Sequence, residues 1–382
     1  MMFSRVVLCL AACLFVWPAF SQTNAPPLKP GEFLTGADIS SLPLHEEKGV
    51  RYFDGGQAGD LISIAKRNGW TVLRVRLWVD PAKKPESEVS NLENVTALGK
   101  RIKAAGLRFL LDIHYSDTWA DPGHQKKPAA WAELPFPQLV QKVHDYSREV
   151  IEHLREKEAL PDIVQVGNET RNGLLYGSGV NGAGEQVGGG FWEPNKGGIE
   201  RAVRLFVAGI NGVREGAPQQ APQIMLHVPD GQDTGFIKWY FAMLDETGKK
   251  ANPPMKLDYD LIGLSYYPAD PWDAKAGYEP WHLSHLVNSM NYLATTLHKP
   301  VMVVETNWQQ AGEVRPIPGK PEFAFTSEGQ AQFYKALIAT VRAVPDGMGR
   351  GVLAWDTDTL NWQSVFDAKG NALPALRALG QK

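Results

Sequence analysis

Cysteine is nearly absent from this chain of 382 residues, which contains only Cys9 and Cys13. Both lie in a segment that resembles an export signal, so a disulfide framework and a thiolate metal site are excluded for the rest of the chain. An excess of charge of one sign is also lacking, because the formal net charge is −3. This balance argues against nucleic acid or an anionic membrane surface as a partner.

No apolar run in the N-terminal segment is long enough to span a bilayer. Arg5 supplies a positive charge, an apolar run follows from Val6 to Val16, and Ala19-Phe20-Ser21 fits a small-x-small cleavage site. These features are typical of a signal peptide, and we expect a secreted or periplasmic protein. Leu10-Ala11-Ala12-Cys13 also resembles a lipoprotein processing box, which leaves open an anchor attached to Cys13.

The chain is rich in short apolar segments that alternate with amphipathic ones. Strands are predicted at residues 33–40, 71–78, 108–115, 162–168, 223–228, 260–266, 300–305 and 351–355. Helices are predicted at residues 57–68, 92–105, 136–158, 198–215, 235–246, 283–297 and 327–344, the last opened by a capping box of Ser327 and Gln330. Eight strands alternating with helices are typical of an α/β fold of one (β/α)8 TIM barrel. We assign residues 1–21 to the signal peptide, 22–31 to a linker and 32–382 to the barrel domain.

Two glutamates end apolar, β-branched runs of the kind that form buried parallel strands. Glu169 ends the run from Asp162, and Glu305 ends the run from Pro300. An acid in such a place is poorly solvated and needs a reason to be there. Strands four and seven of a barrel face each other across its mouth, where active sites lie. Their carboxyl groups would then lie about 5–5.5 Å apart, as in retaining glycosidases. The alternative for each glutamate is a buried ion pair with Arg74 or Arg76.

Two such carboxyl groups need different pKa values. Glu305 would be ionised and act as nucleophile, assisted by a nearby arginine and the hydroxyl of Tyr266. Glu169 would be the acid/base, its pKa raised by the charge of Glu305 and by partial burial. Asn168, which precedes the acid, would donate to the sugar 2-hydroxyl.

Other polar and aromatic side chains stand at or just after the predicted strand ends, where they would contact substrate. These candidates are Asp38, Arg76, His114, Asp117, Trp119, His227 and Trp355. Each has a plainer interpretation: a packed aromatic ring, an Asx-turn loop around Asp117, or a core histidine bonded to a carbonyl at His227. The acids and histidines match no tight ligand set, and GxGxxG is absent, so we expect neither a metal nor another cofactor.

Five motifs resemble family 53 of the glycoside hydrolases, the arabinogalactan endo-β-1,4-galactanases. They are Gly36-Ala37-Asp38-Ile39-Ser40-Ser41-Leu42, Leu73-Arg74-Val75-Arg76-Leu77-Trp78, Asp112 to Gly123 with Lys127-Pro128-Ala129-Ala130-Trp131, Gln165-Val166-Gly167-Asn168-Glu169, and Gly263-Leu264-Ser265-Tyr266-Tyr267-Pro268. They occur in order between residues 36 and 268, and the motif after the third strand is the longest.

The resemblance implies retaining, endo-acting hydrolysis of β-1,4-galactan, the side chain of type I arabinogalactan in pectin. It implies that Glu169 is the acid/base and Glu305 the nucleophile. Two alternatives stay open: a related enzyme that cleaves another β-linked glycan such as mannan, and a glycan-binding barrel without activity. We expect a monomer whose partner is the polysaccharide, with no nucleic acid or membrane partner.

Overall fold

The computed structural model describes residues 28–29, 31–191, 197–268, 282–312 and 321–380. The expected signal peptide and most of the expected linker therefore lie outside the described residues. Within the described ranges, no helix combines the length and the apolar character that crossing a bilayer requires.

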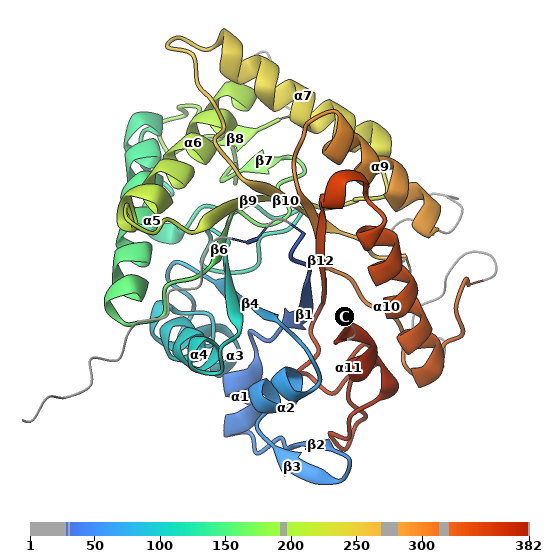
Figure 1. The fold of residues 1–382 in the computed structure, drawn as a ribbon. Helices are drawn as coiled ribbons and strands as arrows, with labels where there is room; N and C mark the ends of the chain where they lie inside the picture. Colours follow the sequence, from blue (N-terminus) through green and yellow to red (C-terminus); the bar gives the residue numbers. More distant parts are fainter. Residues whose placement is uncertain (1–27, 30, 192–196, 269–281, 313–320, 381–382) are drawn as a thin grey trace, which may run out of the picture.

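Eight parallel strands form a closed barrel at the centre of the molecule (Figure 1). They are β1 (Leu34–Asp38), β4 (Val72–Leu77), β5 (Arg108–Ile113), β6 (Ile163–Val166), β9 (Gln223–Val228), β10 (Leu261–Ser265), β11 (Val301–Glu305) and β12 (Gly349–Ala354). Each strand pairs with its neighbours in chain order, and β1 closes the barrel by pairing with both β4 and β12. The prediction of a single (β/α)8 barrel is confirmed.

Helices surround the barrel, and the longer ones follow the predicted ranges closely (Figure 1). They are α2 (Leu61–Arg67), α4 (Leu92–Ala104), α5 (Phe136–Glu156), α6 (Gly198–Gly216), α7 (Thr234–Lys250), α9 (Leu283–Thr295) and α10 (Ser327–Arg342). Three short helices were not predicted from the sequence: α1 (Leu42–Glu47), α3 (Pro85–Glu88) and α11 (Pro374–Leu379). The pair β7 (Gly173–Leu174) and β8 (Gly189–Gly190) was not predicted either, since two-residue strands have almost no periodicity.

Two details of the predicted helices are wrong. The helix predicted from residue 57 begins at Leu61, because residues 57–59 are β3, which pairs with β2 (Tyr52–Asp54), and the Asp60 side chain then caps the helix. The capping box at Ser327 is not formed. Thr326 is the N-cap instead, and its hydroxyl accepts from the Gly329 N–H.

The inner face of the barrel changes from apolar to polar along four neighbouring strands, β4, β5, β6 and β9. Its lower layer is formed by Leu34, Val72, Leu110, Ile163, Met225, Leu261, Met302, Val304 and Leu353. Side chains on one face of a strand recur every two residues. The next inward positions on four strands therefore carry Arg74, Asp112, Gln165 and His227, all fully buried. This polar layer lies directly beneath the C-terminal ends of the strands and supports whatever binds there.

Candidate active site

A fully buried guanidinium organises the mouth of the barrel. Arg74 on β4 reaches five side chains that lie on or just after four other strands, β1, β5, β6 and β11. Its partners are Asp38 at 3.0 Å, Asp112 at 2.9 Å, Glu305 at 2.8 Å, Asn168 at 2.9 Å and Gln165 at 2.7 Å. Three carboxylates share this cation, so it does not fully neutralise any one of them.

Glu305, at the end of β11, lies between a cation and a hydroxyl. Arg74 approaches Oε1, and the Tyr267 hydroxyl donates to Oε2 at 2.9 Å. Burial raises the pKa of Glu305 to about 7, while Arg74 and the Tyr267 hydrogen bond lower it and so limit the increase. The two lowering contacts stabilise the ionised form, as an attacking carboxylate requires.

Glu169 follows β6 in an environment without a cationic partner of that kind. Its backbone has a φ of 45°, a left-handed conformation that is unusual for a residue with a side chain. Its Oε1 lies 2.6 Å from the Ser265 hydroxyl oxygen. Burial raises the pKa of Glu169 well above its usual value, and the charge of Glu305 raises it further. Glu169 therefore favours the protonated form more than Glu305, whose charge is stabilised by Arg74 and the Tyr267 hydroxyl.

The tyrosine that contacts Glu305 is Tyr267, and the choice of Tyr266 from the sequence is wrong. Tyr266 is buried away from the mouth, and its ring stacks on that of Phe333 with centroids 6.4 Å apart. Ser265 faces into the barrel, and alternation then turns Tyr266 outward and Tyr267 inward. Gly263, Ser265 and Tyr267 are spaced two residues apart and therefore lie on one face of the strand. This spacing was the sequence signal that could have identified the right tyrosine.

Two tryptophans present aromatic surface at the mouth. Trp119 is 43% exposed, and its ring centroid lies 6.0 Å from that of the half-buried Trp355. Arg76 lies against the ring of Trp119, with its guanidinium carbon 4.3 Å from the ring centroid and its donors bonded to Ser41 and Ser90. Arg76 was expected to contact substrate, but its buried guanidinium supports Trp119 instead.

Three further candidates are held by protein hydrogen bonds. Asp38 accepts from Arg74 and from the Ser40 N–H, and His114 Nδ1 accepts from the Ala120 N–H at 3.0 Å. Asp117 accepts from two backbone N–H groups, those of residues 80 and 129, so it anchors the loop after β5. These contacts brace the walls of the site, which is the plainer interpretation of these residues.

Asn168 and His227 contact each other directly, next to Glu169. The Asn168 amide oxygen lies 2.8 Å from His227 Nδ1, and His227 Nε2 lies 2.9 Å from the Ser265 hydroxyl oxygen. His227 is fully buried, so it acts through its neighbours and does not contact substrate. The sequence analysis did not single out Ser265, which joins this histidine to Glu169.

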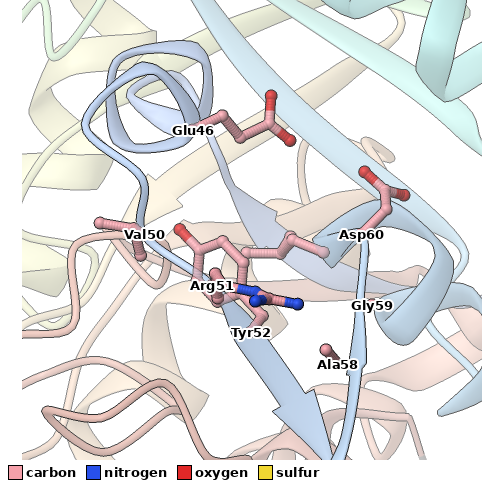
Figure 2. A pocket seen from close by; sticks show the side chains of 8 residues that line it. Glu46, Val50, Arg51, Tyr52, Ala58, Gly59 and Asp60 are labelled. Atoms are coloured by element: carbon pink, nitrogen blue, oxygen red, sulfur yellow. The ribbon is translucent and has the colours of Figure 1, made fainter.

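A pocket of about 260 Å³ lies elsewhere, between α1 and the β2–β3 hairpin (Figure 2). Its acids, Glu46 and Asp60, share the guanidinium of Arg101 at 2.7 Å each. None of the mouth residues lines this pocket. Among the described residues, no three His, Cys, Asp or Glu side chains are grouped to hold a metal ion.

Comparisons with known proteins agree with this geometry. The model of glycosyl hydrolase family 53 matches residues 34–379. A probable arabinogalactan endo-beta-1,4-galactanase A of Aspergillus terreus is 37% identical, with 84% of each chain covered. The arabinogalactan endo-beta-1,4-galactanase of Cellvibrio japonicus is 32% identical, over 96% of this chain and 95% of its own. A solved structure of a fungal beta-1,4-galactanase superimposes with a TM-score of 0.79 at 30% identity, over 91% of this chain and 99% of its own.

Replacing the central cation tests its structural role. We expect Arg74→Met to lower the free energy of unfolding in urea by about 3–5 kcal/mol, because it leaves buried carboxylates without their shared partner. The control is Arg101→Met, which removes a 39% exposed arginine that also joins two acids. Screening by water limits that loss to about 1 kcal/mol. Equal losses in the two variants would contradict a central role for Arg74.

Proposed function

Because the chain belongs to glycosyl hydrolase family 53, we propose that it hydrolyses β-1,4-galactan at internal linkages with retention of configuration. The observation that carries the proposal is the unequal pair of carboxyl groups at one barrel mouth. Arg74 and the Tyr267 hydroxyl stabilise the charge of Glu305 against a burial that raises its pKa to about 7, whereas burial and the charge of Glu305 favour the protonated form of Glu169. Retaining glycosidases need this division of roles.

In the first step, a carboxylate oxygen of Glu305 attacks the anomeric carbon, and the bond from that carbon to the leaving oxygen breaks. Glu169 gives its proton to the leaving oxygen, and a glycosyl ester of Glu305 forms. Water then attacks the anomeric carbon while Glu169 takes a proton from it, and Glu305 leaves as a carboxylate. Arg74 and Tyr267 hold the carboxylate that is consumed and regenerated.

The surroundings of the pair suit a pyranose. Trp355 and the exposed face of Trp119 offer the flat apolar surfaces on which sugar rings stack. Asn168 uses one amide hydrogen on the Ala120 carbonyl at 2.7 Å and keeps a second one, which we assign to the sugar 2-hydroxyl. The alternatives are not favoured, since named relatives are galactanases and a binding protein has no need of both acids.

We also propose that residues 1–21 are a signal peptide, and that the mature chain is exported to the periplasm or secreted as a monomer that acts on the galactan of pectin. The apolar run from Val6 and the site at Ala19-Phe20-Ser21 support export. Intact-mass measurement of the exported protein should give a chain that begins at Gln22, and light scattering should give the mass of one chain. A lipid-modified N-terminus at Cys13 would contradict free release.

Conservative substitution of each glutamate tests the chemistry. We expect Glu169→Gln and Glu305→Gln to lower kcat on β-1,4-galactan by a factor on the order of 10²–10⁴ or more, since each removes a group that acts on the reacting bond. Reducing-sugar release measures this, and circular dichroism confirms folding. Glu246→Gln, on the exposed face of α7, is the control and should keep full activity.

Product analysis completes that experiment. Unmodified enzyme should release oligosaccharides from galactan while mannan, xylan and cellulose stay intact, and NMR should first show β-anomers. A fully active Glu305→Gln variant or α-anomers as the first product would refute the assignment. Cleavage of mannan in preference to galactan would favour the related-enzyme alternative.

The two adjacent tyrosines give a sharper test of the site. Tyr267→Phe removes a hydrogen bond to a carboxylate, worth about 1.5–3 kcal/mol, so kcat/KM should fall about 10- to 100-fold. The hydrogen bond lowers the pKa of Glu305, so its loss should move the acidic limb of the kcat/KM profile to higher pH. Tyr266→Phe changes a ring packed on Phe333 and should leave the profile in place. A larger effect from Tyr266→Phe would contradict the assignment.

A further inference from the structure

We propose that His227 and Ser265 form a one-way chain of hydrogen bonds that keeps the proton on Glu169, because the chain offers this carboxyl group only an acceptor. The inference rests on the proposed function for the role of Glu169 as acid/base. His227 and Ser265 are then positioning residues, which act on the reaction through the carboxyl group of Glu169. Each link follows from which atoms carry hydrogen.

The first link fixes the orientation of the Asn168 amide. Its Nδ2 donates to the Ala120 carbonyl at 2.7 Å, and its Oδ1 accepts from Arg74 at 2.9 Å. An inverted amide would set NH₂ against a guanidinium N–H and a carbonyl oxygen against another carbonyl oxygen. The oxygen of Asn168 therefore faces His227.

The second link fixes the tautomer of His227. Its Nδ1 lies 2.8 Å from the Asn168 oxygen, so the ring hydrogen is on Nδ1. The backbone N–H of Glu169 also points at Nδ1, but from 3.4 Å, which is too long to compete. Burial lowers the pKa of His227 well below its usual value, and the nearby charge of Arg74 lowers it further. A neutral ring has one N–H, so Nε2 has only a lone pair.

The third link fixes the direction of the Ser265 hydroxyl, which has a single hydrogen. Its oxygen lies 2.9 Å from His227 Nε2 and 2.6 Å from Glu169 Oε1. With the hydrogen on the bond to Nε2, the oxygen accepts from a protonated Glu169, and both contacts are satisfied. With an ionised Glu169, the hydrogen can serve only one of two acceptors, and the other contact sets lone pair against lone pair.

Loss of the proton from Glu169 thus leaves one unfavourable contact at the Ser265 hydroxyl, and this contact disappears when Glu169 is protonated again. This matters in the second step, when Glu305 is esterified and its charge no longer favours the protonated form. The Ser265 chain persists through both steps and keeps Glu169 basic enough to take a proton from water. It complements the repulsion from Glu305, which acts only while that carboxylate is free.

Several other charged or titratable groups act on Glu169, on its partner Glu305 or on His227. They are Asp38 on β1, Asp121, Asp112 and His114 on or after β5, Asp230 after β9, Tyr267 after β10, Arg74 on β4, Arg171, which pairs with Asp230, and Glu305 itself. A change at Ser265 leaves all of them in place. The effect of that change on pH dependence therefore isolates the hydroxyl.

The test is the pH dependence of kcat/KM on galactan in Ser265→Ala. The result is the direction in which the basic limb of this pH profile moves relative to that of the unmodified enzyme. If Ser265 accepts from protonated Glu169, its removal lowers the pKa of the acid, and the limb moves to lower pH by about half a unit to one unit. If Ser265 instead donates to ionised Glu169, the limb moves to higher pH. Movement to higher pH, or no movement, would overturn the proposal.

Matched variants complete the pH measurement. Ser265→Thr keeps a hydroxyl and should restore the limb toward its original position. Ser147→Ala is the control, since this buried serine on α5 bonds to Tyr115 and to the Val143 carbonyl, away from the glutamates. It should leave the limb where it is.

A second measurement needs no activity. The ¹⁵N spectrum of histidine-labelled protein, with His227 assigned by comparison with His227→Gln, should show a neutral ring with hydrogen on Nδ1 between pH 5 and 8. A charged ring or an Nε2–H tautomer would overturn the inference even if galactan is cleaved. The expected tautomer in a protein that cleaves no glycan would leave the hydrogen-bond chain standing and refute the proposed function.

Discussion

The active site depends on one buried cation. Arg74 lies inside the barrel, where an unpaired charge is very costly, so its guanidinium must be matched by carboxylates and amide oxygens from neighbouring strands. The match places Asp38, Asp112 and Glu305 around a single group. Structural and chemical demands are met by the same contacts, because the ion pair that makes Arg74 tolerable also lowers the pKa of Glu305 against the effect of burial.

The two glutamates are chemically identical and differ only in their neighbours. Glu305 has a guanidinium and a phenol, whereas Glu169 has a serine hydroxyl whose hydrogen is directed toward a neutral histidine. Arg74 contributes to both environments: it contacts one carboxyl group and orients the Asn168 amide that sets the tautomer next to the other. One residue therefore helps to separate the two pKa values.

The fold was largely predictable, because strand and helix periodicity survives in a single sequence. All eight barrel strands were found, since parallel strands buried on both faces are continuous apolar runs. The short helices and the β2–β3 hairpin were missed, because their few residues contain fewer than two full periods. At residues 57–59 a tertiary pairing replaced the expected first turn of a helix.

The identities and strand positions of Glu169 and Glu305 were in the sequence, because an acid at the end of a buried strand stands out against its surroundings. Which tyrosine meets Glu305, and that Arg76 lies beneath Trp119, depended on which face of the backbone each side chain occupies. The direction of the hydrogen bonds to Glu169 depended on distances among side chains far apart in the chain. Residue types and their order are known from the sequence alone, whereas the position of the proton on Glu169 depends on contacts that exist only in the closed barrel.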